Sequence, residues 1–314
     1  MAFSFRLKGK DWFGLYLAVL VFYFVPAIAL QLLGNHMKSE PKNLIDLLYM
    51  LCIFSFMVFV LLLLATPVLK KIINNIYLND RPLKYSGDTA EFFFMNIGNL
   101  LLSVITLGVY FPWYMTRLMK YLVGKTSYED NNFCFNGKGL HLFGLLLATL
   151  ALPIALFSII IAFLARGHAS TMYFTIMSQA LAFLIVVPYI YWVYKWVVNI
   201  TFKEYLITWE TSAISSLGKI FMEMALTLVT VGIYYPAAIA KLYGYFMDRT
   251  IVSKMDFKVY SFNVELNYFK VWKFLWIQIL LTLITCGIYG AWAYCNVCAL
   301  ILNNTSLSKL ETSN

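Results

Sequence analysis

Apolar runs of about twenty residues recur along the whole chain and restrict it to the membrane class of proteins. Seven runs occur: Trp12–Leu33, Leu44–Thr66, Phe92–Tyr110, Leu140–Ala165, Met172–Tyr194, Leu217–Tyr235 and Val271–Tyr289. An α-helix of ~20 residues crosses the ~30 Å hydrocarbon core, and lipid favours helices because their backbone polar groups pair internally. Charged residues make up 12% of the chain, against about 25% in soluble domains. We expect an all-α polytopic membrane protein with about seven hydrophobic helices.

A motif of the form Thr-x-Gly-x-Tyr ends three of these runs, at Gly108, Gly232 and Gly287. Polar residues occupy the same offsets from each glycine. They are Asn99, Ser103, Thr106 and Tyr110; Glu223, Thr227, Thr230 and Tyr234; and Gln278, Thr282, Thr285 and Tyr289. Steps of four, three and four residues place each set on one helix face. The pattern predicts three related helices, each with one polar stripe.

Two interpretations of the stripes remain open. Glu223 is the only acidic residue at the centre of an apolar run, and a carboxylate at that depth normally faces a partner, a cavity or water. If the stripes converge, they line a path for a small solute or ion. Alternatively the hydroxyl groups join neighbouring helices, and Glu223 pairs with Lys219 one turn away. The convergent path is our leading hypothesis.

The chain divides into units that resemble one another. We place a first unit at 1–130, a second at 131–256 and a partial third, which lacks the first two helices, at 257–314. The segment Phe3–Gly9 before the first run matches Phe133–Gly139 before the fourth. The first run is therefore interpreted as a structural helix rather than a cleaved signal peptide.

Basic residues discriminate between two topologies. If all seven runs cross the membrane, the 24 Lys and Arg residues divide almost evenly between the sides. If the motif helices enter and return on one side, only Lys38, Lys42 and Arg166 face outward, as the positive-inside rule favours. In this second arrangement the strand-like segments Phe3–Phe5, Leu83–Tyr85, Phe133–Phe135 and Tyr260–Phe262 are all cytoplasmic.

Aromatic and basic residues follow the motifs, and we expect them to contact lipid headgroups. The candidates are Trp113, Arg117, Tyr121 and Lys241. The net charge of +9 fits a cytoplasmic surface that attracts anionic lipids, without any need for nucleic acid. A homo-oligomer is compatible with this pattern.

Catalytic chemistry has little support in the sequence. His36, His141 and His168 form no metal-binding spacing, and the Cys295/Cys298 pair has no second pair nearby. No phosphate loop or nucleophile motif occurs. We therefore expect no enzyme activity, no metal and no cofactor.

The region from Phe92 to Gly137 resembles the YjgN-like family of bacterial inner-membrane proteins. The resemblance rests on Ile105–Trp113, Arg117, Tyr121, Gly124–Thr126 and Phe133–Gly137. Ala237 replaces the tryptophan in the second unit, and the third lacks both the proline and the basic residue. The resemblance implies a multi-pass protein of the bacterial inner membrane and supplies no activity. A non-transporting scaffold that binds lipids or partner proteins is therefore the alternative to a solute path.

Overall fold

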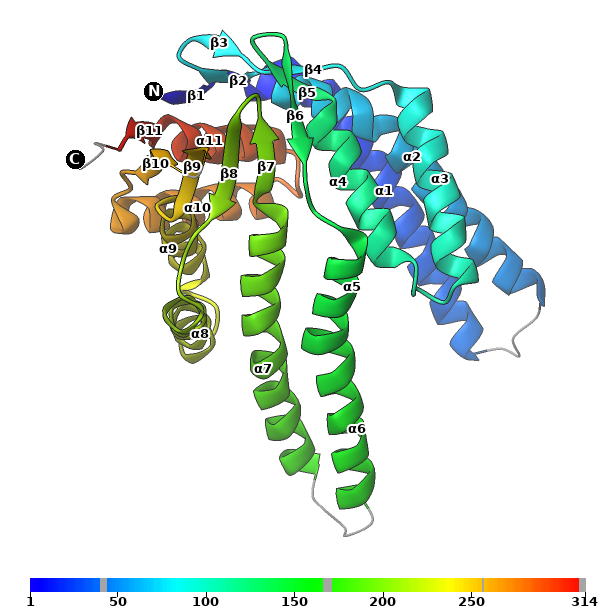
Figure 1. Ribbon diagram of the computed structural model, residues 1–314. Coiled ribbons are helices and arrows are strands. Elements are labelled where there is room, and N and C mark those ends of the chain that lie inside the picture. Colours follow the sequence, from blue (N-terminus) through cyan, green and yellow to red (C-terminus); the bar gives the residue numbers. More distant parts are fainter. Residues whose placement is uncertain (40–43, 166–170, 256, 311–314) are drawn as a thin grey trace.

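The structure, a computed structural model, describes residues 1–39, 44–165, 171–255 and 257–310, which are mostly helical (Figure 1). The helices are α1 (Gly9–Ser39), α2 (Leu44–Ile73), α3 (Thr89–Ile105), α4 (Phe111–Gly124), α5 (Gly139–Leu146), η1 (Leu147–Ala151), α6 (Leu152–Ala165), α7 (Thr171–Val197), α8 (Ala213–Val229), α9 (Tyr235–Met247), α10 (Tyr268–Ile284) and α11 (Gly290–Asn303). The strands are β1 (Phe3–Phe5), β2 (Ile76–Leu78), β3 (Arg81–Pro82), β4 (Lys84–Tyr85), β5 (Thr126–Tyr128), β6 (Asn131–Phe135), β7 (Asn199–Phe202), β8 (Tyr205–Trp209), β9 (Thr250–Lys254), β10 (Phe257–Val264) and β11 (Thr305–Lys309).

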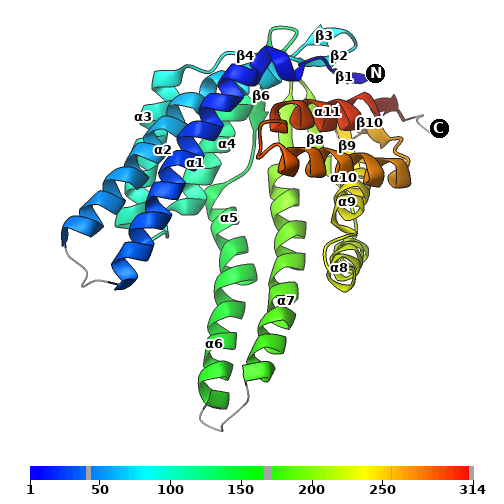
Figure 2. The same ribbon diagram turned by 180° about the vertical axis from the view of Figure 1, so that it is seen from behind.

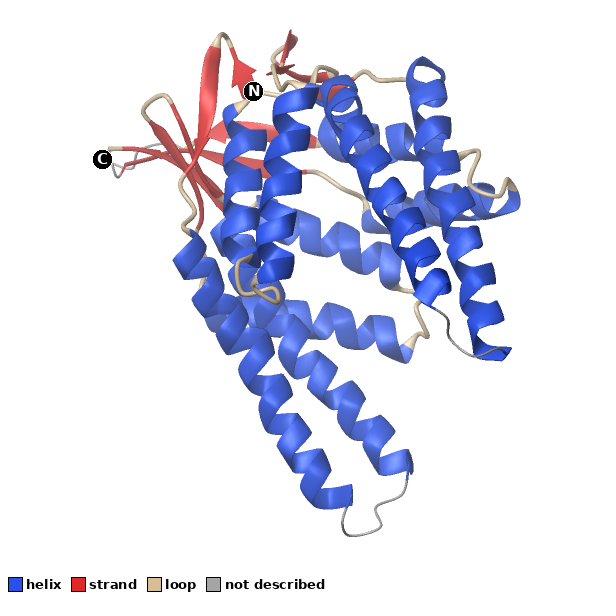
Figure 3. Cartoon of the chain, turned by 90° about the vertical axis from the view of Figure 1, so that its right-hand side faces the viewer, coloured by secondary structure: helices blue, strands red, loops and turns tan. Residues whose placement is uncertain are grey.

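Each helical hairpin is preceded by one strand and followed by another, and these two strands pair with each other. β1 and β2 flank α1–α2, β4 and β5 flank α3–α4, and β6 and β7 flank α5–α7. In the same way β8 and β9 flank α8–α9, and β10 and β11 flank α10–α11. All these pairs are antiparallel. Figure 3 shows the strands gathered at one end of the molecule, together with both termini, while the helices extend away from them.

Tight turns join one strand pair to the next at the rim away from the helices. Asn79-Asp80 have φ of 48° and 62°, and Glu129-Asp130 have φ of 49° and 61°. Two successive left-handed residues form a type I′ turn, whose twist matches that of antiparallel strands. Every helical hairpin therefore starts and ends at the opposite rim of the strands.

The strands close into a ring. At one seam the Met1 amine donates to the Leu307 carbonyl oxygen at 2.7 Å, and Ala2 forms a bridge with Ser306 of β11. At the other seam only Leu83 separates β3 from β4, and its amide donates to the Ile76 carbonyl oxygen at 2.8 Å. The seams join the three-stranded sheet β1–β3 to the eight-stranded sheet β4–β11. A closed ring has no long unpaired edge for another chain to extend.

The concave face of the ring is apolar and aromatic. The Phe3 and Phe262 rings stack with centroids 6.0 Å apart although β11 lies between their strands, and Tyr205 contacts Tyr260 at 6.2 Å across β9. Contacts that skip a strand require strong curvature toward the side chains. The register places further apolar residues on this face: Phe5, Phe133, Phe135, Phe202, Ile207, Trp209, Val252 and Val264. Alternate residues such as Ser4, Thr201 and Ser261 face outward.

The expected all-α class is correct for the helices but too narrow. The expected strand-like segments correspond to β1, β4, β6 and part of β10. The prediction did not include their partner strands, which form two antiparallel sheets. Most of those partners are only three to five residues long, so little alternation is visible in the sequence.

Seven membrane crossings are not confirmed. Every predicted run contains a helix, but α3, α8 and α10 have only 17 residues each and turn back into a second helix. Within the described ranges, three segments are long and apolar enough to cross a membrane: Gly9–Asn35, Leu44–Ile73 and Gly139–Ile160.

The short hairpins are α3–α4, α8–α9 and α10–α11, and the long hairpins are α1–α2 and α5–α7. Contacts between a tryptophan and a glycine hold two of the short hairpins against the long ones. A Cβ placed on Gly139, at the start of α5, would lie 2.7 Å from the Trp113 ring of α4. A Cβ on Gly9, at the start of α1, would lie 2.5 Å from the Trp292 ring of α11. Figure 2 shows α11 beside the start of α1. The second hairpin is followed by α10 and not by a long hairpin, and α9 carries Ala237 at this position. The packing explains the missing tryptophan.

Candidate functional site

The motif turns all have one backbone conformation. After α3, Leu107 and Gly108 are both left-handed, with φ of 50° and 87°. The Gly108 amide donates to the Ser103 carbonyl oxygen at 2.7 Å, and the Leu107 amide donates to that of Val104 at 3.0 Å. This is a Schellman motif, in which glycine usually occupies the first left-handed position. Here glycine occupies the second, and a residue with a side chain occupies the first.

The other two turns repeat these angles. Val231 and Gly232 have φ of 50° and 85°, and Cys286 and Gly287 have φ of 47° and 90°. A β-branched residue such as Val231 rarely adopts positive φ, because its side chain crowds the backbone. The turn therefore retains an apolar side chain at a strained position in all three hairpins.

Those side chains and their neighbours leave the hairpin tips apolar and exposed. Leu107 is 95% exposed and Val231 is 90% exposed. The residues around them are also exposed: Val104, Ile105, Val109, Leu228, Val229, Ile233, Leu283, Ile284 and Ile288. Contiguous apolar patches of this kind mark sites that contact a membrane or another protein.

In the first hairpin the polar stripe closes on itself. The side-chain oxygen of Asn99 in α3 accepts a hydrogen bond from the Tyr110 hydroxyl at 3.0 Å and another from Arg117 Nη1 of α4 at 3.0 Å. The Arg117 guanidinium also lies over the Tyr110 ring, 5.6 Å from its centroid. Asn99 is buried, so these two donors satisfy an oxygen that has little access to water.

The second hairpin uses charged groups in the same arrangement. Glu223 is 2% exposed, and its Oε2 accepts from the Tyr234 hydroxyl at 2.8 Å. Lys241 Nζ donates to the same hydroxyl at 2.7 Å. Lys219 Nζ lies 2.7 Å from Glu223 Oε1, the ion pair that belonged to the alternative interpretation of the stripes. The buried carboxylate therefore has a hydrogen-bonded cation, as a buried charge requires.

The third hairpin repeats the pattern with neutral groups. Gln278 Oε1 accepts from the Tyr289 hydroxyl at 3.1 Å and from Asn296 Nδ2 at 3.1 Å. In all three hairpins, then, the residue nine before the glycine binds the tyrosine two after it, and the residue nine after the glycine completes the set. Arg117, Lys241 and Asn296 lie at the same offset from their glycines in the sequence, but the predicted stripes did not include them.

The hydroxyl residues of the stripes bond mainly to their own backbone. Ser103, Thr227 and Thr282 donate to the carbonyl oxygen four residues earlier at 2.7–2.8 Å. Thr106, Thr230 and Thr285 accept from the amide of the motif tyrosine, at 3.0 Å in each case. These groups close the turn and leave few free donors for a solute.

No hydrogen bond among the described residues joins the Asn99, Glu223 and Gln278 sets to one another. Each set connects the two helices of its own hairpin. Each set therefore acts as a polar clasp across one hairpin. A cavity of about 710 Å³ does lie beside the second clasp, between α7, α8 and α9, and Glu223, Thr227 and Tyr235 line it among otherwise apolar neighbours.

Two of the residues expected at lipid headgroups lie inside the hairpin packing. The Trp113 ring stacks on Tyr110 and contacts Phe143 of α5, with centroids 5.4 Å apart. The Tyr121 hydroxyl donates to the Asp88 carbonyl oxygen at 3.0 Å, and the residue is 9% exposed. Their lipid contacts stay a prediction, as do those of Arg117 and Lys241.

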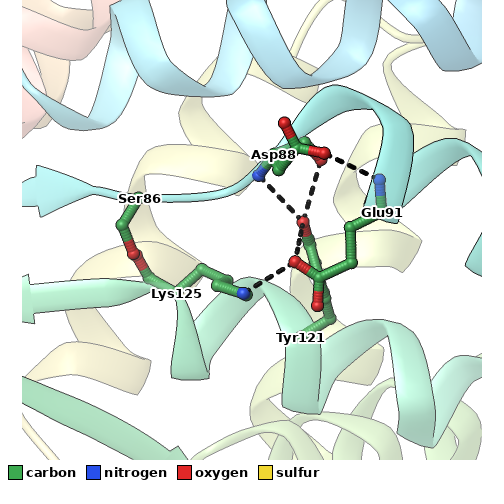
Figure 4. A network of polar contacts seen from close by, with 5 residues as sticks. All are labelled: Ser86, Asp88, Glu91, Tyr121 and Lys125. Atoms are coloured by element: carbon green, nitrogen blue, oxygen red, sulfur yellow. Dashed lines mark hydrogen bonds and ion pairs between the residues drawn. The ribbon is translucent and has the colours of Figure 1, made fainter.

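The base of the first hairpin has a second polar network (Figure 4). Asp88 caps α3 by accepting from the Glu91 amide at 2.9 Å, and Lys125 Nζ binds Glu91 Oε2 at 2.7 Å. The hydrogen bond that Lys125 donates to the Glu91 carboxylate raises the pKa of Lys125 above its usual value. The network fixes the start of α3 to the end of α4, next to the strand pair.

Comparison with known proteins matches only part of the chain. Residues 80–209 match the family described as "Bacterial protein of unknown function (DUF898)". A segment of 90 residues is 24% identical to "Inner membrane protein YjgN" of Salmonella typhimurium, and it covers 29% of this chain and 22% of that relative. No solved structure matches the chain. The two matches support the resemblance of this chain to a YjgN-like bacterial family.

Proposed function

We propose that the protein is a non-transporting scaffold of the bacterial inner membrane, which inserts helical hairpins from the cytoplasmic side and organises the surrounding lipid. The observation that carries the proposal is the closure of each polar stripe within its own hairpin. A solute path needs polar groups that face a shared passage. Groups that satisfy one another allow two short helices to enter an apolar medium together.

The exposed tips support insertion. Transfer of an exposed apolar side chain such as that of Leu107 from water into lipid is favourable by about 25 cal/mol for each Å² of apolar surface buried. A helix of 17 residues is about 25 Å long, which is less than the ~30 Å hydrocarbon core. Since α3 returns through α4 to the same strand pair, the hairpin enters and leaves on one side.

Insertion from one side has a mechanical consequence. Three short hairpins, each with an apolar tip, add more volume to the leaflet that they enter than to the opposite one. The ring of strands holds their bases together, so the added volume is concentrated under one protein. This arrangement suits a protein that shapes the membrane or positions lipids and partners within it.

Cysteine labelling tests this topology. In a cysteine-free background, single cysteines are placed at Leu107 and Val231 in the tips, at Glu129 and Lys203 in the rim turns, and at Asn99 and Gln278 in the clasps. An impermeant thiol reagent is then added to either side of sealed vesicles. We expect the rim turns to react from the cytoplasmic side only, and tips and clasps to react from neither. Labelling of the tips from the opposite side would refute one-sided insertion.

A path for a small solute or ion is the second candidate, and the cavity beside Glu223 favours it. Its test is proton or potassium flux in vesicles reconstituted with wild type or Glu223→Gln. A loss of flux in the variant, together with labelling of a cysteine at Thr227, would support the path over the scaffold. Absence of flux in wild type would remove this candidate.

A further inference from the structure

A second cavity lies where the start of the chain meets its end. It has a volume of about 660 Å³, and it is bounded by the segment Phe5–Lys10 and by one face of α11. That face presents Trp292, Cys295, Asn296 and Ala299, which follow one another at helical spacing. We propose that this cavity binds the phosphate headgroup of an anionic phospholipid.

Two lysines supply the charge. Lys8 and Lys10 both line the cavity, and neither has an ion-pair partner among the described residues. Arg6 also lines it, but Arg6 is bound to Asp80 and stacked on the Tyr77 ring. Asp11 follows in the chain and does not line the cavity. The free positive charge at this site is therefore that of the two lysines.

The space exists because α11 has short side chains where α4 has long ones. Counted from the motif glycine, Asn296 corresponds to Arg117, and Ala299 corresponds to Lys120. The Asn296 amide is held by Gln278 and Tyr289, so it is drawn toward its own clasp. Arg117 and Asn296 both turn toward their own clasps, so the short Ala299 side chain, where α4 has Lys120, is what leaves this face of α11 open beside Lys8 and Lys10.

The position of the cavity matches headgroup depth, a point that rests on the insertion proposed above. Lys8 and Lys10 immediately precede the apolar part of α1, and Trp12 and Trp292 pack together in the cluster next to them. The Trp12 indole donates to the Ala291 carbonyl oxygen at 3.1 Å, which holds α1 against α11. Tryptophan and lysine at this depth are typical of the membrane interface. The phosphate then contacts the lysines, and the acyl chains run along the apolar surface of α1.

The test compares retained lipid in matched variants. Full-length protein is reconstituted in vesicles of phosphatidylcholine with a minor share of phosphatidylglycerol, and the lipids that remain bound after extraction are measured by native mass spectrometry. The double variant K8Q/K10Q is compared with K70Q/K71Q, which removes the same charge from exposed lysines at the end of α2. We expect retention of phosphatidylglycerol to fall roughly tenfold in K8Q/K10Q and to stay at the wild-type level in the control. Equal losses in the two variants, or no loss in either, would overturn the proposal.

A neutral variant separates the cavity from its charge. Ala299→Phe fills the space without a change in charge, so it is expected to lower retention as K8Q/K10Q does. Unchanged retention would show that the lysines act only as a charged surface, and would refute the cavity. Displacement of the lipid by inorganic phosphate or glycerol phosphate would identify a soluble-anion site and overturn the lipid assignment. Failure of one-sided cysteine labelling would reject the proposed function. Correct labelling without selective retention would reject only this inference.

Discussion

The Tyr114 hydroxyl of α4 donates a 2.8 Å hydrogen bond to the side-chain oxygen of Asn96 in α3, one turn nearer the strands than the clasp. Asn96 is 1% exposed, so this oxygen has no ready access to water. The corresponding residues of the second hairpin, Ile220 and Ala238, are both buried and apolar. In the third hairpin they are Leu275 and Ala293, which are also apolar, so this additional hydrogen bond occurs in the first hairpin and not in the other two.

Removal of one partner of this hydrogen bond is expected to cost more than removal of both. Tyr114→Phe leaves the Asn96 oxygen buried and unpaired, so we expect it to lower the free energy of unfolding by about 1–3 kcal/mol. The double variant N96L/Y114F removes both polar groups and should recover most of that loss. Unfolding by denaturant in detergent measures both. Additive losses would contradict the explanation.

The contact between Gly9 and Trp292 predicts a position-specific effect of a methyl group. Gly9→Ala places a Cβ into the indole ring and is expected to destabilise the protein by about 1–3 kcal/mol. Gly14→Ala, one turn later in the same helix, meets no atom within 4 Å and serves as the control. It should be neutral or slightly stabilising, because alanine favours helix over glycine. The thermal midpoint in detergent is the measurement, and equal shifts would contradict the prediction.

The strained turn predicts a trade-off between stability and insertion. Val231→Gly relieves a left-handed β-branched residue and is expected to stabilise the detergent-solubilised protein by about 1 kcal/mol. The same change removes an exposed apolar side chain from the tip, so it should weaken association of the hairpin with lipid. Val229→Gly removes an equal side chain from the helix and should instead destabilise the protein. Stabilisation by both changes would refute the role of strain.

The buried hydroxyl of Tyr85 leads us to expect a loss of folding stability at high pH. Its hydroxyl is buried and has no hydrogen-bond partner in the described part of the chain, and burial raises its pKa to about 12. An unfolded tyrosine has a pKa of about 10. The folded state thus holds this proton more tightly, and the resulting stability is present below about pH 10 and is lost as the pH rises toward 12.

Tyr85→Phe should reduce that pH dependence by the share that Tyr85 contributes. At neutral pH the variant is expected to be as stable as wild type or slightly more stable, since it buries no unpaired hydroxyl. Denaturant unfolding at neutral pH and between about pH 10 and 11 provides the comparison. The same alkaline loss in both proteins would show that other groups control it.

Features written in the local sequence could be predicted. Gly108, Gly232 and Gly287 indicated where three helices end, because a left-handed residue after a helix favours glycine. The ion pair of Glu223 with Lys219 followed from their spacing of four residues. The offsets of the polar residues placed Asn99 and Ser103 on one face of α3, but the prediction that the whole set shares one helix was wrong. The helix ends at Ile105, and Tyr110 lies beyond the turn, from where its hydroxyl reaches back to Asn99.

Features that depend on distant contacts could not be predicted. The closure of the strand ring needs Met1 to meet Leu307, and no local pattern encodes that pairing. We expected the stripes of different hairpins to converge, but each one closes within its own hairpin. Equal offsets in the sequence do not reveal whether a polar group faces another hairpin or the returning helix of its own. The cavity at Lys8 was also invisible, because it depends on the short Ala299 side chain of a helix almost three hundred residues away.

The strand ring favours the arrangement in which the motif helices enter and return on one side over the arrangement with seven crossings. A unit with three membrane helices would reverse the orientation of everything that follows it. In the fold each hairpin supplies its helices together with an incoming and an outgoing strand, so the chain always comes back to the rim from which it departed. The part of the chain after Lys254 has only one hairpin where earlier parts have two, yet its ends reach the same rim. Each hairpin contains an even number of passes away from and back to the rim. A whole hairpin can therefore be gained or lost without reversing the orientation of any later segment.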